Sequence, residues 1–176
     1  ADRIPFSHIM VDEDGIGGGV VDHLIGVKGF TANSSPLPTS SQIRERQAKI
    51  EHFLTPKPIY SNLKAQCGWK LAELINERKI AFQVERYRDV IIEELSALLR
   101  DKDVARDGKK QLRPKDEVKE ELQRSPDIGD AILMRAWFEI KKEALSEDPA
   151  GQRIVAQRIE QKFSQNIRNQ KLNSTK

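Results

Sequence analysis

Three consecutive acidic residues, Asp12, Glu13 and Asp14, stand between a short apolar run and a glycine-rich stretch. The apolar run, residues 8–11, is typical of a short buried strand, and a helical pattern follows the glycines. In an open α/β sheet, ligands bind just beyond the carboxyl ends of the strands. Carboxylates in that place suit a divalent cation, or a phosphate that is held through one. Asp12 and Asp14 are therefore candidate metal ligands.

Three better-known glycine motifs do not fit this stretch. A phosphate-binding loop needs Lys and then Ser or Thr after its last glycine, whereas two valines follow Gly19. The dinucleotide fingerprint needs glycine or alanine where Val20 stands. A calcium loop that began at Asp12 would have Ile16 at an oxygen-ligand position and His23 in place of the final glutamate. What remains is a looser arrangement, in which strand-end carboxylates hold one or two divalent ions.

A second pair of acids, Asp127 and Asp130, opens the long helix that the Ser125-Pro126 sequence predicts. Three residues apart, the two carboxylates lie on one face of the first helical turn. Asp127 also suits the positive end of the helix dipole without any ligand. The apolar neighbours of Asp130 instead predict a place near the sheet. Two ions about 4 Å apart can activate water and stabilise the leaving oxygen in phosphodiester cleavage, and such a site needs several carboxylates from distant parts of the chain.

The elements that position these residues begin with an α/β pattern. Residues 8–11 and 27–30 predict strands, and residues 20–25 predict a helix between them, as in a βαβ unit. We expect residues 33–58 to form an excursion from the core, because Ser, Pro and charged residues dominate it. Further expected elements are helices over 41–54, 62–78, 87–99, 116–122 and from 126 onward, with strands over 80–84 and 111–113. Ser61 is expected to cap the helix that follows it.

Composition narrows the classes of function. The chain has 176 residues, 38% hydrophobic and 32% charged, which is enough for one domain with a core. No apolar run approaches the roughly 20 residues of a membrane helix, and the N-terminus lacks a signal-peptide pattern. With Cys67 as the one cysteine, an internal disulfide and the usual zinc sites are excluded. Any metal would be held by carboxylates, which favours magnesium, manganese or calcium.

The C-terminal residues 149–176 carry the charge asymmetry of the chain. Their single acid is Glu160, and their basic residues are Arg153, Arg158, Lys162, Arg168, Lys171 and Lys176. We expect a basic helical or disordered tail, which either touches nucleic acid or an acidic surface or is simply solvated. The net charge of +3 is by itself too small to indicate a polyanionic partner.

Three segments resemble the nuclease domain of the large terminase subunit of tailed bacteriophages or prophages, which is part of the DNA-packaging motor. The first is the acidic and glycine-rich stretch over residues 11–22. The second, residues 60–67, is similar to the Tyr-x-Asn-x-Lys/Arg stretch before the family's long helix. The third is residues 115–119 together with 125–131. The segments occur in the family's order, and the resemblance covers about residues 8–140.

The resemblance implies an RNase H-like nuclease fold over residues 1–148, a mixed α/β sheet flanked by helices, with a helical C-terminal extension. It implies that the fold is incomplete here, with its first strands missing. The implied activity is metal-dependent endonucleolytic cleavage of concatemeric viral DNA. Mg²⁺ or Mn²⁺ would occupy a two-metal site in the complete domain.

The resemblance also assigns site residues. Asp12 matches the family's second acid and Asp130 its third, so both are the expected catalytic residues and metal ligands. Asp14 and Asp127 are supporting or alternative ligands. Lys115 lies in a stretch where a cation could meet a DNA phosphate. The residues that we expect to bind DNA are Lys115, Lys119, Arg153 and Arg158.

The implied partners are double-stranded viral DNA, the ATPase part of the same subunit, the small terminase subunit and the portal, in the host cytoplasm. The family's first acid lies on a strand well before the one that ends at Asp12, and little sequence precedes His8 here. The expectation is therefore a C-terminal piece of the subunit, whose exposed strand edges favour self-association. The alternative is a non-catalytic module that binds DNA or docks on the motor.

Overall fold

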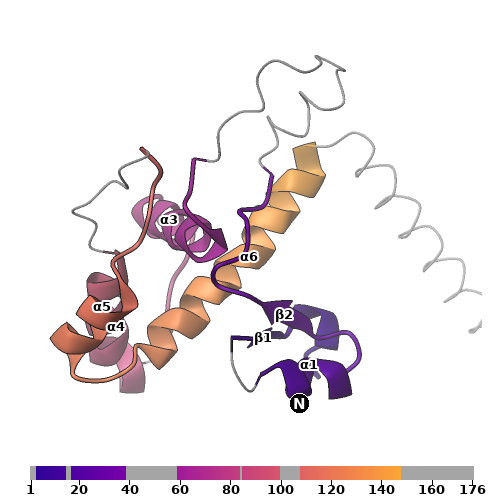
Figure 1. The fold of residues 1–176 in the computed structure, drawn as a ribbon, viewed down its shortest axis with the longest axis horizontal. Helices are drawn as coiled ribbons and strands as arrows, with labels where there is room; N and C mark the ends of the chain where they lie inside the picture. Colours follow the sequence, from indigo (N-terminus) through magenta and orange to yellow (C-terminus); the bar gives the residue numbers. More distant parts are fainter. Residues whose placement is uncertain (1–2, 15–16, 39–58, 84, 100–107, 148–176) are drawn as a thin grey trace, which may run out of the picture. The chain divides into compact units, whose positions relative to one another are not determined.

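The computed structural model describes residues 3–14, 17–38, 59–83, 85–99 and 108–147. Figure 1 shows how the helices and strands of these residues follow one another along the chain. Residues 1–37 and 56–140 form one compact unit, which contains the contacts discussed below. The helix predicted over residues 41–54 lies outside the described residues, and so does the basic tail.

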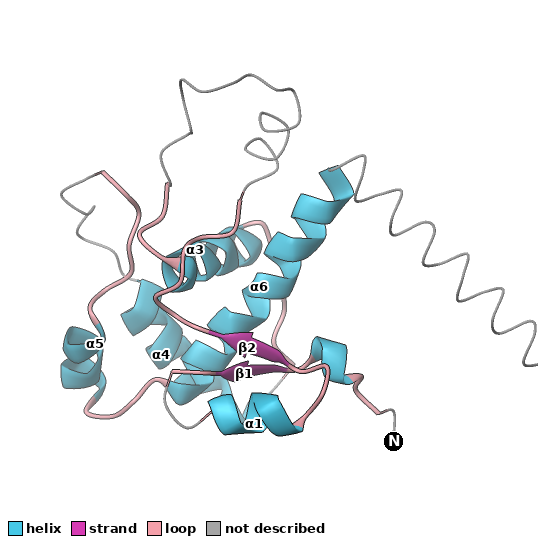
Figure 2. Ribbon diagram, turned by 45° about the vertical axis from the view of Figure 1, so that its right-hand side comes forward, coloured by secondary structure: helices cyan, strands magenta, loops and turns pink. Residues whose placement is uncertain are grey.

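The chain begins with a short βαβ unit. A 3-10 turn, η1 (Phe6–His8), leads into strand β1 (Met10–Asp12), helix α1 (Gly18–His23) and strand β2 (Lys28–Phe30). The two strands pair in parallel, with Asp12 opposite Phe30. Helix α1 packs on both strands, as Figure 2 shows. The predicted strand–helix–strand start is therefore confirmed, and in the described part of the chain the sheet consists of these two strands.

The other described elements are helical. They are α3 (Leu63–Asn76), the 3-10 turn η2 (Glu85–Tyr87), α4 (Arg88–Leu99), α5 (Lys115–Leu122) and α6 (Asp127–Glu147). The apolar periodicity of the sequence predicts all four α-helices within a few residues of these bounds. Helix α4 contacts both α3 and α5, so it joins the two sides of this helical group.

Helices α3, α4 and α6 share one hydrophobic core with β2. Its buried members are Phe30, Leu63, Cys67, Leu71, Ile91, Leu95, Leu133, Ala136 and Ile140. A smaller cluster joins α4 to α5 and consists of Ala97, Leu98, Val118 and Leu122. Burial in the larger core raises the pKa of the Cys67 thiol to about 12. That thiol stays protonated at neutral pH, so Cys67 is a core residue and not a nucleophile.

Two predicted strands are wrong. Residues 80–83 form no strand, and Phe82 is 41% exposed. Alternating apolar residues make a strand only where a neighbour takes up the backbone hydrogen bonds, and no strand of the described chain pairs with this segment. Residues 111–113 form no strand either. Lys110 makes a single parallel bridge with Tyr60, and the ring nitrogen of Pro114 cannot donate to a longer ladder.

Asn62, and not Ser61, caps helix α3. The Asn62 side-chain oxygen accepts a hydrogen bond from the backbone N–H of Ala65 at 2.8 Å, and the Asn62 backbone is extended. Serine and asparagine are both good caps, so the residue types do not separate them. The prediction of Ser61 as the cap is therefore wrong by one residue.

We expect Asn62→Ala to lower the free energy of unfolding by about 1 kcal/mol, because the N–H of Ala65 loses its acceptor. Ser61→Ala is the matched control and should change it by less than about 0.5 kcal/mol. Urea denaturation of the wild type and both variants measures the difference. Equal losses in the two variants would contradict the assignment of the cap to Asn62.

Candidate functional site

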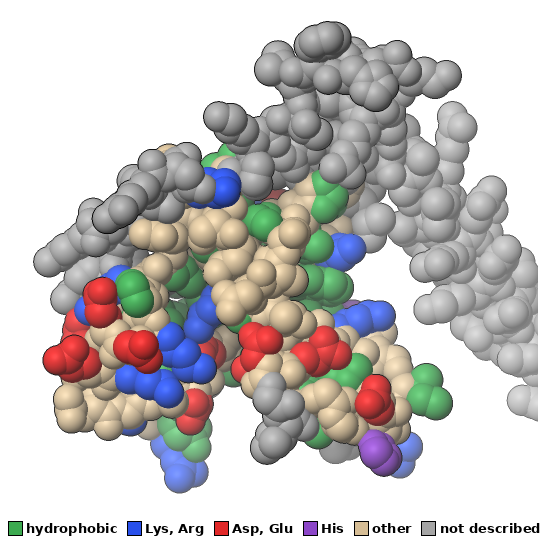
Figure 3. Space-filling model, viewed as in Figure 1, with side chains coloured by type: hydrophobic (Ala, Val, Ile, Leu, Met, Phe, Trp, Pro, Cys, Tyr) green, Lys and Arg blue, Asp and Glu red, His purple; other side chains and the backbone are tan. Residues whose placement is uncertain are grey.

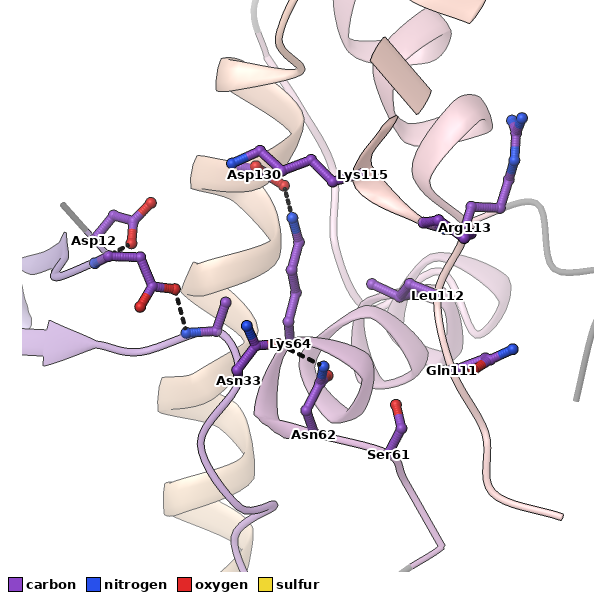
Figure 4. Close-up of a pocket in the computed structure, with 13 residues that line it drawn as sticks. Asp12, Asn33, Ser61, Asn62, Lys64, Gln111, Leu112, Arg113, Lys115 and Asp130 are labelled. Atoms are coloured by element: carbon purple, nitrogen blue, oxygen red, sulfur yellow. Dashed lines mark hydrogen bonds and ion pairs between the residues drawn. The ribbon is translucent and has the colours of Figure 1, made fainter. Parts of the chain in front are cut away.

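A cavity of about 760 Å³ brings together residues from several parts of the chain. Its walls come from the end of β1, the loop after β2, the start of α3, the segment before α5 and the first turn of α6. Figure 4 shows the Lys64 and Lys115 side chains directed toward Asp130, with Asp12 facing them, whereas Arg113 points away. The charged residues that line the cavity are Asp12, Asp14, Lys64, Arg113, Lys115 and Asp130.

The acidic wall is built at the end of β1. The N–H of Asp14 donates to the Asp12 carboxylate at 3.0 Å, and the Asp14 carboxylate accepts from the N–H of Ala32 at 2.9 Å. These bonds tie the strand end to the loop after β2. Glu13 instead folds over Gly29, where a Cβ atom would collide with its carboxyl group. Two of the three consecutive acids therefore line the cavity, and Glu13 does not.

Gly17 packs directly against the main chain of Asp12. A Cβ atom at Gly17 would overlap the carbonyl oxygen of Asp12, so glycine alone lets the loop return this close to the strand end. At Gly18 and Gly19 a Cβ atom would meet nothing within 4 Å. Gly17 is thus the one of these three glycines that a close approach requires.

The loop after β2 holds the start of α3 beside the acidic wall. The N–H of Leu63 donates to the carbonyl of Ser34 at 2.8 Å. The N–H of Lys64 donates to the carbonyl of Ala32 at 3.1 Å. Because the N–H of Ala32 donates to Asp14, main-chain atoms connect the strand end to α3. This arrangement carries the Lys64 side chain into the cavity, as Figure 4 shows.

Asp130 faces Lys64 from the first turn of α6. The Lys64 Nζ atom lies 2.8 Å from Asp130 Oδ1, and the two side chains are 22% and 27% exposed. Oδ1 is itself buried, and the ammonium group does not meet it in hydrogen-bond geometry. Asp130 therefore has a buried oxygen that is neutralised by a cation but accepts no hydrogen bond within the described structure (Figure 4).

Glu94 on α4 fixes the start of α6. One carboxylate oxygen accepts from the N–H of Gly129 at 2.6 Å, and the other contacts the guanidinium group of Arg124. The Glu94 side chain is 1% exposed, whereas Glu93, which pairs with the same guanidinium at 2.6 Å, is 56% exposed. Asp130 follows Gly129 directly, so the buried Glu94 contact determines where the Asp130 carboxylate lies.

Arg113, in the segment before α5, and Lys115, the first residue of α5, add two cations to the cavity lining. The Arg113 guanidinium group is itself paired with Glu121 on α5 at 2.5 Å. The segment before α5 is held beside the start of α3, because the N–H of Ser61 donates to the carbonyl of Lys110 at 2.9 Å. The Lys110 ammonium also lies 4.3 Å from the centre of the Trp69 ring, a cation–π contact. Figure 3 shows acidic and basic side chains side by side on one face of the molecule.

Of the four acids that the sequence predicts as metal ligands, three line the cavity and one does not. Asp12, Asp14 and Asp130 line the cavity. Asp127 is exposed and does not line it, although it lies only three positions before Asp130. An acid in a first helical turn is favoured by the helix dipole alone, and that is the role which its position supports.

The four residues that the sequence predicts to bind DNA also differ in where they lie. Lys115 lines the cavity, whereas Lys119 is exposed on α5 away from it. Arg153 and Arg158 lie outside the described residues. The sequence predicts no role for Lys64, even though it belongs to the stretch that resembles the terminase family. Its place two residues after a helix cap could have indicated a role in the site, since such a position lies at the open end of a helix.

The lining of the cavity includes hard oxygen donors of the type that a divalent cation prefers, among them the carboxylates of Asp12, Asp14 and Asp130. Within the described ranges, no three His, Cys, Asp or Glu side chains come together as ligands of one ion. Mg²⁺ commonly takes one or two carboxylates and completes its shell with water and substrate phosphates. The under-bonded Asp130 oxygen and its lysine counter-ion support this fit. A further protein ligand would have to come from outside the described residues.

Comparison of the chain with protein-family models, with curated proteins and with solved structures gave no match. No helix in the part of the chain that the structure describes is long and apolar enough to cross a membrane. The cavity, with its acids and cations, is therefore the feature from which a function can be argued.

Proposed function

We propose that the chain is part of a metal-dependent nuclease that cuts double-stranded DNA, of the kind found in the large terminase subunit of tailed bacteriophages. The observation that supports this most is the cavity that Asp12 from β1 and Asp130 from α6 both line. In this proposal the strands β1 and β2 and the helices around them are part of an RNase H-like domain.

Asp12 and Asp130 hold Mg²⁺ or Mn²⁺ in this proposal, and Asp14 orients Asp12 through its N–H. A metal held by these residues would supply activation of a water and stabilisation of the leaving oxygen of the phosphodiester. Lys64 and Lys115 neutralise DNA phosphates and set the path of the strand. Their ammonium groups are suited to this because phosphate contacts position a nucleic acid without reading its sequence.

The substrate and the partners in this proposal follow from the resemblance to the large terminase subunit. The substrate is concatemeric viral DNA in the host cytoplasm, and the partners are the ATPase part of the same subunit, the small terminase subunit and the portal. Asp12 and Asp130 together are fewer acids than a two-metal site needs. A third carboxylate comes from outside the described residues, either from another segment or from a second copy through self-association.

Nicking of supercoiled plasmid tests the proposal. Where the third carboxylate is supplied, we expect the wild-type chain to nick the plasmid in Mn²⁺ and to stop in EDTA; without that carboxylate the isolated chain should bind Mn²⁺ but be inactive. Asp12→Asn should lower the rate at least about 100-fold, because a neutral amide is a poor replacement for a carboxylate ligand. Asp22→Asn, on α1 and outside the cavity, is the matched control and should retain the wild-type rate. Nicking that survives Asp12→Asn, or the absence of both nicking and Mn²⁺ binding, would contradict the proposal.

A non-catalytic DNA-binding module is the second candidate. It is favoured by two lysines of the cavity, Lys64 and Lys115, and by the lack of a three-acid group within the described ranges. Binding through these two cations alone predicts a log–log salt slope of about −2, with no requirement for a divalent metal. Fluorescence anisotropy of a labelled duplex, with and without Mg²⁺, separates this candidate from the nuclease.

A further inference from the structure

We infer that the Lys64 ammonium group acts as an internal counter-ion at Asp130, which a divalent cation displaces and which then becomes available to a DNA phosphate. The inference rests on the proposed nuclease function and concerns the regulation of that same cavity. It assigns Lys64 two states, one paired with Asp130 and one facing the substrate.

The ion pair between Lys64 and Asp130 is the first support. Nζ and Oδ1 lie 2.8 Å apart, and about three-quarters of each side chain is buried, with 22% and 27% exposed. The buried Oδ1 atom accepts no hydrogen bond within the described structure. A carboxylate oxygen that is removed from water and bonded by no donor depends on the nearby charge for its stabilisation. The lysine thus supplies the charge that a metal would otherwise supply.

A divalent ion at Asp130 Oδ1 would compete with the ammonium group. Such an ion binds a carboxylate oxygen at about 2.0–2.1 Å, and the Lys64 Nζ atom lies 2.8 Å from Oδ1. Two positive groups so close repel each other in a partly buried site. In this inference the ion takes Oδ1, and Lys64 moves away from it.

Lys64 can move without any change in the backbone. Its N–H is held by the carbonyl of Ala32 at 3.1 Å, while its four-carbon side chain extends into a cavity of about 760 Å³. A released ammonium group in this cavity needs a new anion, and a DNA phosphate supplies one. Metal binding and DNA binding should then strengthen each other, because linkage between two sites is reciprocal.

The Mn²⁺ affinity of substituted chains tests the inference, with free Mn²⁺ measured by electron paramagnetic resonance. We expect Lys64→Gln to bind Mn²⁺ roughly tenfold more tightly than the wild type, because the ammonium group no longer competes with the ion. Tenfold corresponds to about 1.4 kcal/mol in the free energy of binding. Lys64→Arg retains a cation and should remain within about threefold of the wild type. Lys28→Gln removes the same charge from an exposed position on β2 outside the cavity, and should also stay within about threefold.

The outcomes separate this inference from the proposed function. If Asp130→Asn weakens Mn²⁺ binding but Lys64→Gln strengthens it no more than Lys28→Gln does, the counter-ion role is wrong and the metal site remains. If neither the wild type nor Lys64→Gln binds Mn²⁺, both ideas are wrong. Binding by Lys64→Gln alone would support the inference most directly.

A second measurement uses the wild-type chain and does not depend on how a variant folds. Saturating Mg²⁺ should increase the rate at which acetic anhydride modifies Lys64, measured by peptide mass spectrometry, because the released ammonium group enters the cavity. Lys79 pairs with Glu77 and has a 62% exposed side chain, so it serves as the internal reference. An unchanged Lys64 rate in Mg²⁺ would overturn the inference.

Discussion

Asp130→Asn should lower Mn²⁺-dependent nicking at least about 100-fold, whereas Asp127→Asn should leave it within about twofold. The two acids open the same helix, yet Asp130 lines the cavity with its carboxylate near Lys64 and Asp127 does not line it. Asparagine keeps the size of the side chain and removes its charge, so the comparison isolates the anion. Plasmid nicking and Mn²⁺ binding should fall together in the Asp130 variant alone.

Stability provides the control for this prediction. About three-quarters of each side chain of the Asp130 ion pair is buried, so its loss should cost more than the loss of a surface pair, about 1–2 kcal/mol. Asp127→Asn removes a charge that favours the helix dipole and should cost at most about 1 kcal/mol. Urea denaturation should find both variants folded. Comparable loss of nicking in the two variants would show that the cavity does not contain the reacting centre.

Glu94→Ala should lower the free energy of unfolding by about 3 kcal/mol. The substitution leaves the N–H of Gly129 without its acceptor, removes the buried partner of Arg124 and opens a void between α4 and α6. Glu93→Ala is the matched control, because Glu93 neighbours Glu94 and pairs with the same guanidinium but is 56% exposed. That variant should lose no more than about 0.5 kcal/mol.

Glu94→Gln distinguishes charge from hydrogen bonding at this position. Glutamine keeps an oxygen that can accept from Gly129 and fills the same space, so the variant should be less destabilised than Glu94→Ala. Urea denaturation curves of the three Glu93 and Glu94 variants provide the measurement. Equal stabilities of Glu94→Ala and Glu93→Ala would contradict the role of Glu94 in fixing the start of α6.

The βαβ start and the four long helices could be predicted because their signals are local. Alternating or periodic apolar residues, a proline before Asp127 and glycines after β1 depend on neighbours within a few positions. The strand expected over 80–84 failed because a strand also needs a partner, which the sequence does not show. Where α3 ends, the N–H of Lys79 instead returns to the carbonyl of Leu74 at 2.8 Å, and no strand follows in residues 80–83.

The candidate site could be predicted as a set of acids but not as a cavity. Asp12 and Asp130 are prominent through their positions at a strand end and a helix start. The distinction between Asp130 and Asp127 depends on how α6 is docked, and the buried Glu94 contact sets that. The place of Lys64 depends on the loop after β2, whose residue types indicate only that it is a loop.

The loop between β2 and α3 meets both walls of the cavity through main-chain atoms. The N–H of Ala32 bonds Asp14, while the carbonyls of Ala32 and Ser34 receive the first N–H groups of α3. The backbone of three consecutive residues, 32–34, therefore sets how far the acids lie from the lysine. An insertion between Ala32 and Ser34 would shift the start of α3 relative to the end of β1, whereas Ser34→Ala would keep every one of these main-chain bonds.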